Sequence, residues 1–377
     1  MITPQFFINA LAKKGISFFA GVPDSLLKNV CAYITDNITP INNIIAANEG
    51  GAMGLAAGYH LATGKVPVVY MQNSGEGNIV NPLLSLTDKD VYNIPVLLLI
   101  GWRGEPGKHD EPQHVKQGKV TLSLLDAMGI KYAVLSDVAA EAEIQITEAY
   151  AYMQETKEAY ALIIRKGTFD EYKLQVKEES SLILSRESAI GIVAGNIEDD
   201  AIIVSTTGMI SRELFEYRTN NNQSHEQDFL TVGSMGHASQ IALGVALHQP
   251  DRRVYCFDGD GASIMHMGNM SIVGCMYPKN YVHIIFNNGA HDSVGGQPTV
   301  GLKINLSQIA EAVGYAHVFS VSNESELTDT LAKVKSLEDL IFIEVKVKKG
   351  ARKDLGRPIT TPIENKEALM NFIKNEK

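Results

Sequence analysis

The sequence predicts an α/β protein with two doubly wound domains, each built on a mainly parallel sheet covered by helices on both faces. In the first half of the 377-residue chain, short apolar runs alternate with helical patterns, and the second half repeats this alternation. The segment at residues 171–186 is rich in charge, which is typical of an exposed linker. We therefore expect one domain at residues 1–180 and a second at residues 181–377.

The predicted elements follow from the position and length of the apolar runs. Residues 1–15 predict an amphipathic helix rather than a signal peptide. Strands of the first half are predicted at residues 17–20, 43–46, 66–70, 96–100 and 161–164. Strands of the second half are predicted at residues 201–204, 253–257, 282–286 and 342–345. Continuous apolar runs of this kind are typical of parallel strands that are buried on both faces.

The composition indicates which kinds of protein and binding partner are consistent with this chain. Hydrophobic residues make up 45% of the chain and charged residues 20%, as in ordinary globular proteins. The formal net charge of −10 argues against a nucleic-acid-binding surface, although local basic groups can still bind an anionic substrate. Three cysteines, Cys31, Cys256 and Cys275, are too few for a disulfide framework, and we expect them to be reduced in the cytoplasm. No stretch approaches the length of a membrane span.

Ligands of open α/β sheets bind outside the carboxyl ends of the strands, so the polar residues after each apolar run are the candidate site. In the second half, Asp260 follows one run within a Gly-Asp-Gly sequence, and Asn288 follows the next run. Their oxygens suit a hard cation, and Mg²⁺ held by few protein ligands usually keeps phosphate oxygens in its shell. The sequence therefore predicts a metal that anchors a phosphorylated cofactor.

These two motifs resemble the signature of thiamine diphosphate-dependent decarboxylases, in which Gly-Asp-Gly is followed about a helix and a strand later by Asn-Asn. The resemblance implies a thiamine diphosphate-binding fold and a Mg²⁺ ion held by Asp260, Asn288 and the backbone carbonyl of Ala290. The central domain of longer family members has no room in this chain. The resemblance therefore implies only a pyrimidine-binding domain and a diphosphate-binding domain.

A second match is the sequence Asn48-Glu49-Gly50-Gly51, which opens a helix of small residues after an apolar run. It resembles the family's turn whose glutamate hydrogen-bonds the aminopyrimidine of a cofactor bound by another subunit. This implies a homodimer or higher homo-oligomer with active sites at the subunit interface, and Glu49 as the catalytic glutamate. The alternative for Glu49 is a charge that only complements the helix dipole.

Other segments of the second half resemble the rest of the cofactor site. Gly233-Ser234-Met235-Gly236 resembles the segment that bends the cofactor, with Met235 beneath it and the Gly233 carbonyl receiving the exocyclic amine. The alternative for Met235 is a core filler. The resemblance also implies diphosphate contacts from a turn after an earlier strand and from the helix after Asp260; these residues are Thr207, Gly208, Gly261, Ala262 and Ser263.

The loops of the first half and the segment after Asn288 resemble those of family members that act on a 2-oxo acid with a phosphonate on C3. We therefore expect decarboxylation of 3-phosphonopyruvate to phosphonoacetaldehyde, with sulfopyruvate or another 2-oxo acid as the alternative. This anion needs cationic and N–H donors. Arg103 is the main candidate, unless it forms a surface salt bridge, and Ser74 and His291 are further candidate contacts.

Two more residues are expected to be catalytic. Asp24 matches an acid that family members place near the substrate, and it could return a proton after carbon dioxide leaves; a second, compatible role is to cap a helix starting at Ser25. His114 lies in a predicted loop, residues 104–119, that could close over the site. No Gly-x-Gly-x-x-Gly opens a βαβ unit, which disfavours a nicotinamide-dependent dehydrogenase. A protein that only senses thiamine diphosphate remains an alternative.

Overall fold

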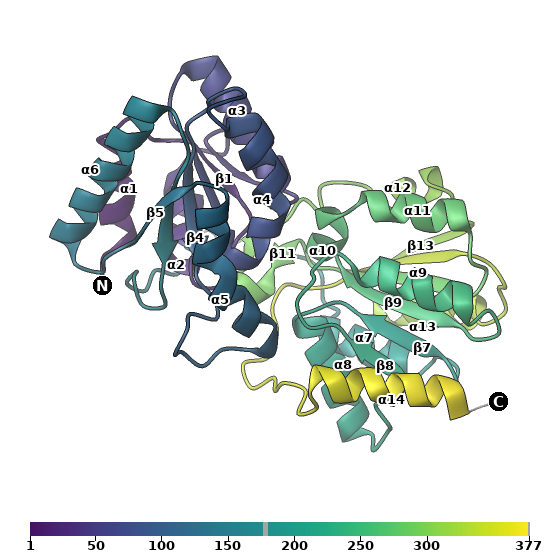
Figure 1. Ribbon diagram of the computed structural model, residues 1–377. Coiled ribbons are helices and arrows are strands. Elements are labelled where there is room, and N and C mark those ends of the chain that lie inside the picture. The colour runs from purple at the N-terminus through teal and green to yellow at the C-terminus, as the bar shows by residue number, and fades with distance from the viewer. Residues whose placement is uncertain (176–179, 376–377) are drawn as a thin grey trace. The chain divides into compact units, whose positions relative to one another are not determined.

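A computed structural model describes residues 1–175 and 180–375, and the chain divides into two compact units, Met1–Glu178 and Glu179–Lys377 (Figure 1). Part of the predicted linker falls on residues 176–179, which lie outside the described residues. The first unit's last strand ends at Ile164, and the second unit's first helix begins at Arg186. Among the described residues between them there is no further helix or strand, so the chain has no central domain.

The first unit is built on a parallel sheet with the spatial strand order β2, β1, β3, β4, β6, β5. All of its neighbouring strands are parallel. In chain order the strands are β1 (Phe19–Gly21), β2 (Asn43–Ile45), β3 (Val68–Gln72), β4 (Leu97–Gly101), β5 (Lys131–Val134) and β6 (Tyr160–Ile164).

Helices cover both faces of this sheet because successive residues of each buried strand face opposite sides. In β4, Leu97 and Leu99 pack in one core cluster, whereas Leu98 and Ile100 pack in the other. The first cluster contains residues of α1 (Pro4–Ala12), α2 (Lys28–Asn37) and α6 (Ala139–Thr156). The second contains residues of α3 (Glu49–Thr63), α4 (Glu76–Pro82), the π-helical turn η2 (Leu83–Thr87) and α5 (Pro112–Ala127). A short 3₁₀ turn, η1 (Asn73–Gly75), follows β3.

The second unit repeats this plan with the spatial order β13, β14, β10, β9, β7, β8, again with parallel neighbours. The strands are β7 (Ile202–Ser205), β8 (Asp228–Leu230), β9 (Val254–Gly259), β10 (Tyr281–Asn287), β13 (His317–Val321) and β14 (Ile341–Lys346). A small antiparallel pair, β11 (Ala290–His291) and β12 (Gln297–Pro298), follows β10.

Two core clusters again lie on opposite faces of the sheet. One contains residues of α7 (Arg186–Ala194), α8 (Met209–Asn220) and α13 (Glu324–Val334). The other contains residues of α9 (Ala238–His248), α11 (Gly268–Met276), α12 (Leu306–Ala312) and α14 (Pro362–Asn375). The short helices α10 (Asp260–Met265) and η3 (Asp292–Val294) follow β9 and β11.

The predicted fold class is confirmed, and each predicted strand is present within two residues of its predicted start. The sequence missed β5, β8 and β13, which lie at edges of the two six-stranded sheets, and the short pair β11 and β12. Most residues of β5 and β13 are only partly buried, so these strands lack the continuous apolar run on which the prediction relied. In the part of the chain that the structure describes, no helix is both long and apolar enough to cross a membrane.

Close packing in the second unit depends on Gly274 in α11. A Cβ atom on Gly274 would lie 1.8 Å from the carbonyl oxygen of Val313, which belongs to the backbone that follows α12. Because a backbone atom cannot swing aside as a flexible side chain can, any larger residue must separate these two segments.

We expect Gly274→Ala to lower the midpoint of thermal unfolding, because overpacking costs about 1–3 kcal/mol. The matched control is Gly244→Ala in α9, where a Cβ would meet nothing within 4 Å. Since alanine restricts the unfolded chain more than glycine does, this control should unfold at the same or a higher temperature. Equal midpoints for the two variants would contradict the packing role of Gly274.

Candidate active site

Polar residues that follow β1, β3 and β4 lie together at the carboxyl edge of the first sheet. Asp24, which follows β1, is fully buried. Its Oδ1 accepts a hydrogen bond from the Gln72 side chain at 2.6 Å, and its Oδ2 accepts one from the Leu26 N–H at 2.9 Å. Gly101 leaves room for this carboxyl group, because a Cβ there would lie 2.1 Å from Asp24 Oδ2. Burial raises the pKa of Asp24, against the effect of the Gln72 hydrogen bond.

The expectation that Asp24 caps a helix starting at Ser25 is wrong. Residues 25–27 form a turn, and α2 begins only at Lys28, without a side-chain cap. The Asp24 carboxyl group instead binds the N–H of Leu26 inside that turn, as short polar side chains often do. Its second oxygen is thereby left facing Gln72 at the end of β3.

Glu49 is the first residue of α3, as expected, and it is 5% exposed. Asn48 caps the helix by accepting a hydrogen bond from the Gly51 N–H at 2.8 Å. The Asn78 side-chain amide donates to Glu49 Oε2 at 2.6 Å, and a Cβ on Gly75 would lie 2.4 Å from Glu49 Oε1. The carboxyl group is therefore held in place by a neighbouring segment, which a charge that only complements the helix dipole does not require.

Arg103 follows β4 and forms a salt bridge with Asp110 of the same unit. Its Nε donates to Asp110 Oδ2 at 2.8 Å and its Nη2 donates to Asp110 Oδ1, while Nη1 donates to the Ser25 hydroxyl at 2.7 Å. Burial acts to raise the pKa of Asp110, but the Arg103 hydrogen bonds and charge outweigh it and lower the value to about 2. The salt bridge that was the alternative for Arg103 is therefore present, although both side chains are less than one-fifth exposed.

His114 lies beside this ion pair in the first turn of α5. The predicted loop at residues 104–119 is therefore only half correct, because helix begins at Pro112. Burial lowers the pKa of His114 to about 4, and the positive charge of Arg103 adds to this effect. A neutral imidazole at physiological pH can accept a proton, and its Nδ1 has no hydrogen-bond partner.

Ser74 extends the polar network to the surface. Its hydroxyl donates to Gln72 Oε1 at 2.7 Å, and the same Gln72 side chain donates to Asp24. Ser74 precedes Gly75, against which Glu49 packs. The structure thus joins Asp24 to Ser74 through Gln72 within one unit.

In the second unit, the candidate metal ligands follow two neighbouring strands. Asp260 follows β9 and is 2% exposed, and Asn288 follows β10, which pairs with β9. The Thr299 hydroxyl donates to Asp260 Oδ2, and burial raises the pKa of Asp260 to about 6. The carboxylate and amide oxygens are hard ligands, and a divalent cation would stabilise the charged form of the buried acid.

The third candidate ligand is the backbone carbonyl of Ala290. Opposite Ala290 in the β11–β12 pair stands Pro298, which has no N–H to donate. The N–H groups of Thr299 and Gly296 go instead to the carbonyls of Gly289 and His291, at 2.8 Å and 2.9 Å. The pairing therefore does not occupy the Ala290 carbonyl, and the donor set at this turn fits Mg²⁺.

Glycines surround this turn and bring other segments close to it. A Cβ on Gly261 would lie 2.9 Å from the His291 ring, and a Cβ on Gly208 would lie 3.9 Å from the Ser293 hydroxyl. The Thr207 hydroxyl accepts a hydrogen bond from the Gly233 N–H at 3.1 Å. Because glycine has no side chain, this cradle of residues leaves backbone open to close approach by a ligand, which fits a bound diphosphate.

The turn at residues 233–236 packs on α10, in which the other candidate cofactor residues Ala262 and Ser263 are buried. A Cβ on Gly236 would lie 3.0 Å from the Ala262 carbonyl oxygen. Ser234 has a φ of 47°, which is unusual for a residue other than glycine, and it precedes the half-buried Met235. The structure therefore gathers the predicted cofactor residues of the second unit around the carboxyl ends of β7, β9 and β10.

Sequence reasoning missed the buried ion network that holds the metal turn. Arg186 donates to Asp292 at 3.0 Å and forms a bidentate pair with Glu213. Asp292 also accepts a hydrogen bond from the Asn288 side-chain amide at 2.7 Å. The network thereby fixes the orientation of the Asn288 amide, but Arg186 and Asp292 are 106 positions apart, so no local pattern could have indicated it.

A second omission is Glu76, at the start of α4. It is fully buried, and neither carboxyl oxygen has a hydrogen-bond partner. Burial raises its pKa to about 8; Thr121 opposes this shift only weakly, because its hydroxyl donates to the Gln117 carbonyl. Glu76 lies between two glycines, and no apolar run in Gly75-Glu76-Gly77 marks it as a buried position.

Comparisons with known proteins agree with this geometry. Residues 1–130 match the model of the thiamine pyrophosphate enzyme N-terminal TPP binding domain, and residues 206–345 match that of the C-terminal TPP binding domain. The chain is 32% identical to a phosphonopyruvate decarboxylase of Streptomyces viridochromogenes, over 99% of this chain and 95% of the relative. It is 31% identical to a phosphonopyruvate decarboxylase of Streptomyces hygroscopicus, over 99% of this chain and 94% of the relative. A sulfopyruvate decarboxylase of Methanosarcina acetivorans is 28% identical, over 91% and 90%.

The buried Glu76 predicts a pH-dependent stability. Its pKa is about 8 in the folded protein, above the usual 4.5 of the unfolded chain, so the folded state binds the proton more tightly. This contribution is complete below pH 4.5 and is lost as the pH rises through 8. Glu76→Gln keeps the shape without the charge, so it should unfold at a higher temperature than the unmodified protein at pH 8.5 and at about the same temperature near pH 4.5.

The control for this measurement is Glu155→Gln, at an exposed position of α6. It should match the unmodified protein at both pH values. A Glu76→Gln variant with the same shift in unfolding temperature at both pH values would contradict a buried, protonated Glu76.

Proposed function

Since the chain belongs to the thiamine pyrophosphate-dependent decarboxylases, we propose that it converts 3-phosphonopyruvate to phosphonoacetaldehyde and carbon dioxide. The substrate is carried over from two relatives named phosphonopyruvate decarboxylases that align over nearly the whole chain. This reaction would give the enzyme a place in phosphonate biosynthesis, including that of 2-aminoethylphosphonate. Sulfopyruvate is the second candidate, because a decarboxylase of that compound aligns over 91% of the chain.

One structural observation supports the cofactor most directly. Asp260, Asn288 and the Ala290 carbonyl are candidate Mg²⁺ ligands at a single turn, next to glycines that admit close backbone approach. We assign this turn, together with the cradle residues Thr207, Gly208, Gly233, Gly261, Ala262 and Ser263, to the diphosphate end of the cofactor, and Met235 to its bend. Thiamine diphosphate, when bound, would supply a nucleophilic ring carbon for the keto group and a cationic ring that accepts the electron pair of the departing carboxylate.

Glu49 is the proposed partner of the aminopyrimidine ring. Asn78 and Gly75 hold its carboxyl group in one orientation, which reduces the cost of aligning it with the ring. Glu49 belongs to the first unit and the metal turn to the second. We propose that residues 1–180 bind the pyrimidine, that residues 181–377 bind the diphosphate and metal, and that a homodimer or higher homo-oligomer joins them at its subunit interface.

Asp24 is the proposed proton donor after carbon dioxide leaves. A raised pKa favours the protonated form, and the hydrogen bond from Gln72 fixes the direction of the carboxyl group. His114 is neutral at physiological pH and is proposed to accept or pass on a proton rather than to provide a positive charge. Both residues belong to the same unit as Glu49.

The substrate phosphonate needs N–H donors or positive charge, and Arg103 remains the proposed source. Asp110 already occupies the Nε–Nη2 edge of its guanidinium group. Arg103 therefore acts either through its charge or by exchanging Asp110 for the phosphonate. Ser74 and His291 are proposed as further contacts, and burial lowers the pKa of His291 to about 4, so His291 would bind as a neutral imidazole.

We propose that the enzyme works in the cytoplasm. Cys31 and Cys256 are buried, Cys275 is exposed, and all three are free thiols in the structure. A reducing compartment keeps such thiols unpaired.

The first test of substrate is the release of carbon dioxide by the purified protein with thiamine diphosphate and Mg²⁺. Phosphonopyruvate, sulfopyruvate and pyruvate are compared at equal concentration, and we expect the highest kcat/KM with phosphonopyruvate. A preference for sulfopyruvate or pyruvate would retain the cofactor chemistry and reject the substrate. Binding of thiamine diphosphate without turnover of any of the three would favour a sensing protein.

The test of Glu49 is the Glu49→Gln variant, which keeps the size of the side chain but cannot share a proton as a carboxyl group does. We expect kcat to fall by about 10²–10⁴-fold, the usual contribution of a positioned acid or base.

A matched control is Glu324→Gln. Glu324 opens α13 after the capping residue Asn323, just as Glu49 opens α3 after Asn48, so both variants lose the same interaction with a helix dipole. The control should keep its full kcat. A Glu49→Gln variant with the rate of the control would reject the catalytic role of Glu49.

A further inference from the structure

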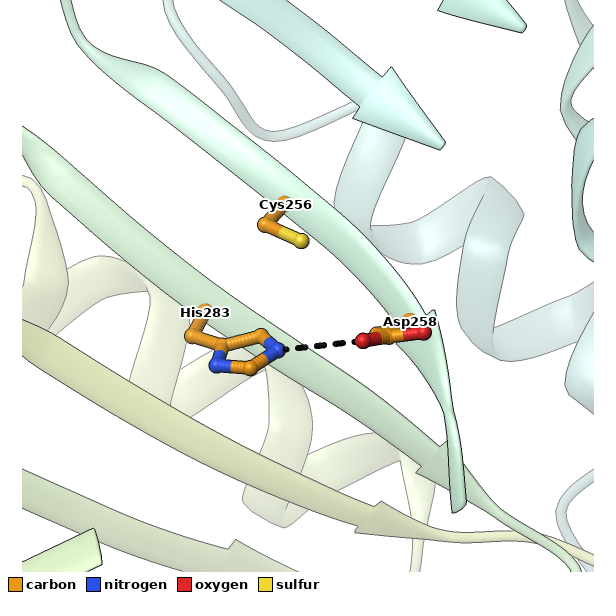
Figure 2. Close-up of side chains that lie close together, drawn as sticks. All are labelled: Cys256, Asp258 and His283. Carbon is orange, nitrogen blue, oxygen red and sulfur yellow. Dashed lines mark ion pairs between the residues drawn. The ribbon is translucent and has the colours of Figure 1, made fainter. Parts of the chain in front are cut away.

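A buried polar cluster lies on the face of β9 and β10 that packs against α9 and α11. Cys256 and Asp258 lie two positions apart on β9, and His283 stands next to Cys256 on β10 (Figure 2). All three are at most 1% exposed. Their neighbours are apolar or aromatic, and the His283 ring contacts the rings of Tyr315 and Phe342. Burying polar side chains in such surroundings costs free energy of folding. None of the roles proposed above uses these three residues.

The contacts of this cluster form a chain that ends at the metal turn. The Tyr315 hydroxyl lies 3.0 Å from His283 Nδ1, and His283 Nε2 lies 3.5 Å from Asp258 Oδ2, the pair joined by the dashed line in Figure 2. The other oxygen of Asp258 accepts a hydrogen bond from the Gly259 N–H at 3.0 Å. Gly259 immediately precedes Asp260.

A neutral imidazole can satisfy this chain in one of its two tautomers. If Nε2 of His283 carries the proton, it points to Asp258, and Nδ1 accepts the proton of the Tyr315 hydroxyl. His283 Nε2 and Asp258 Oδ2 are buried and have no hydrogen-bond partner, so the 3.5 Å contact between them is the polar contact on which each depends. Removal of His283 would therefore free the Asp258 carboxyl group to leave the Gly259 N–H.

An apolar pair would fill this space at less cost, because replacing buried charged or polar partners by apolar residues is often neutral or stabilising. The stability of the core therefore does not explain the cluster. The hydrogen bond that the Gly259 N–H donates to Asp258 does explain it, because this bond fixes the backbone where the chain leaves β9 and turns into α10. The position of the Asp260 carboxylate depends on that backbone.

We propose that Asp258 and His283 are positioning residues, which hold the turn at Gly259 so that Asp260 meets the divalent cation in the correct geometry. The inference rests on the proposed function, in which this turn binds Mg²⁺ together with thiamine diphosphate. Cys256 lies beside the chain and takes no part in it. Partners that orient metal ligands from behind typically change metal affinity by 10–100-fold when they are removed.

The test measures metal binding without turnover. Mn²⁺ replaces Mg²⁺ as the probe, because the same hard oxygen ligands accept it, and free Mn²⁺ is followed by electron paramagnetic resonance in the presence of excess thiamine diphosphate. We expect Asp258→Ala and His283→Phe to raise the Mn²⁺ dissociation constant about tenfold or more. Asp258→Asn should bind nearly as well as the unmodified protein, because its amide oxygen still accepts the Gly259 N–H.

Cys256→Ala is the matched control, on the same strand and the same face. It should lower the unfolding temperature, because it empties part of the core, but leave Mn²⁺ binding within about twofold. If Asp258→Ala does not fold, His283→Phe carries the test, since phenylalanine fills the space of the imidazole among aromatic neighbours. If neither variant folds, Mn²⁺ binding is measured on the double variant Asp258→Asn/His283→Phe, which leaves no buried charge and no imidazole behind the turn. A Mn²⁺ dissociation constant equal to that of the unmodified protein would then reject the proposal.

Two results would overturn the positioning role. Variants that unfold at lower temperature but bind Mn²⁺ like the unmodified protein would show that the cluster only fills the core. One equivalent of a tightly bound transition metal in the unmodified protein, lost in Cys256→Ala, would show that the three side chains bind a metal of their own. A failure of the unmodified protein to bind Mn²⁺ with thiamine diphosphate would instead reject the proposed function.

Discussion

The second unit is organised around one buried carboxylate, that of Asp260, at the end of β9. An acid with so little access to water is stable in its charged form only if nearby groups compensate it, and its raised pKa of about 6 shows that the protein groups alone do so incompletely. The Thr299 hydroxyl contributes one hydrogen bond, and Gly301 has no side chain because a Cβ there would lie 2.5 Å from the carboxylate. A divalent cation would supply the missing compensation, which is why this turn, rather than another strand end, is the candidate metal site.

The first unit also contains buried polar groups at the carboxyl edge of its sheet, but there protein side chains provide the partners. Asp24 follows β1 and Arg103 follows β4 at the same sheet edge, and each has protein partners, Asp24 in Gln72 and Arg103 in Asp110. Both side chains are therefore fixed in direction before any substrate binds, which lowers the cost of reorganisation during a reaction. The same arrangement restricts how an anion can approach Arg103, since Asp110 already fills its bidentate face. If Arg103 binds the phosphonate as proposed, substrate selection depends on the Arg103–Asp110 pair as much as on Arg103 itself.

Much of the fold and of the candidate site was predictable because it depends on local pattern. Continuous apolar runs identified the central strands, and polar residues directly after those runs, such as Asp260 and Asn288, identified the edge at which ligands bind. The edge strands β5 and β13 were missed because they are buried on only part of their surface. The helix expected after Asp24 was displaced by three residues, because the carboxyl group binds the turn at Leu26 instead of a helix end.

The sequence by itself determined the order of the elements, the class of fold and the residue types at the strand ends, since these follow from periodicities of a few residues. Only the tertiary structure decided which charged groups have partners and which are buried. Arg186 and Asp292 meet across 106 positions, and Glu76 lies in a segment that looks exposed but has no access to water. Such pairings depend on how distant strands and helices pack. An unpaired buried charge is unfavourable, so buried charged groups find partners that no local pattern indicates.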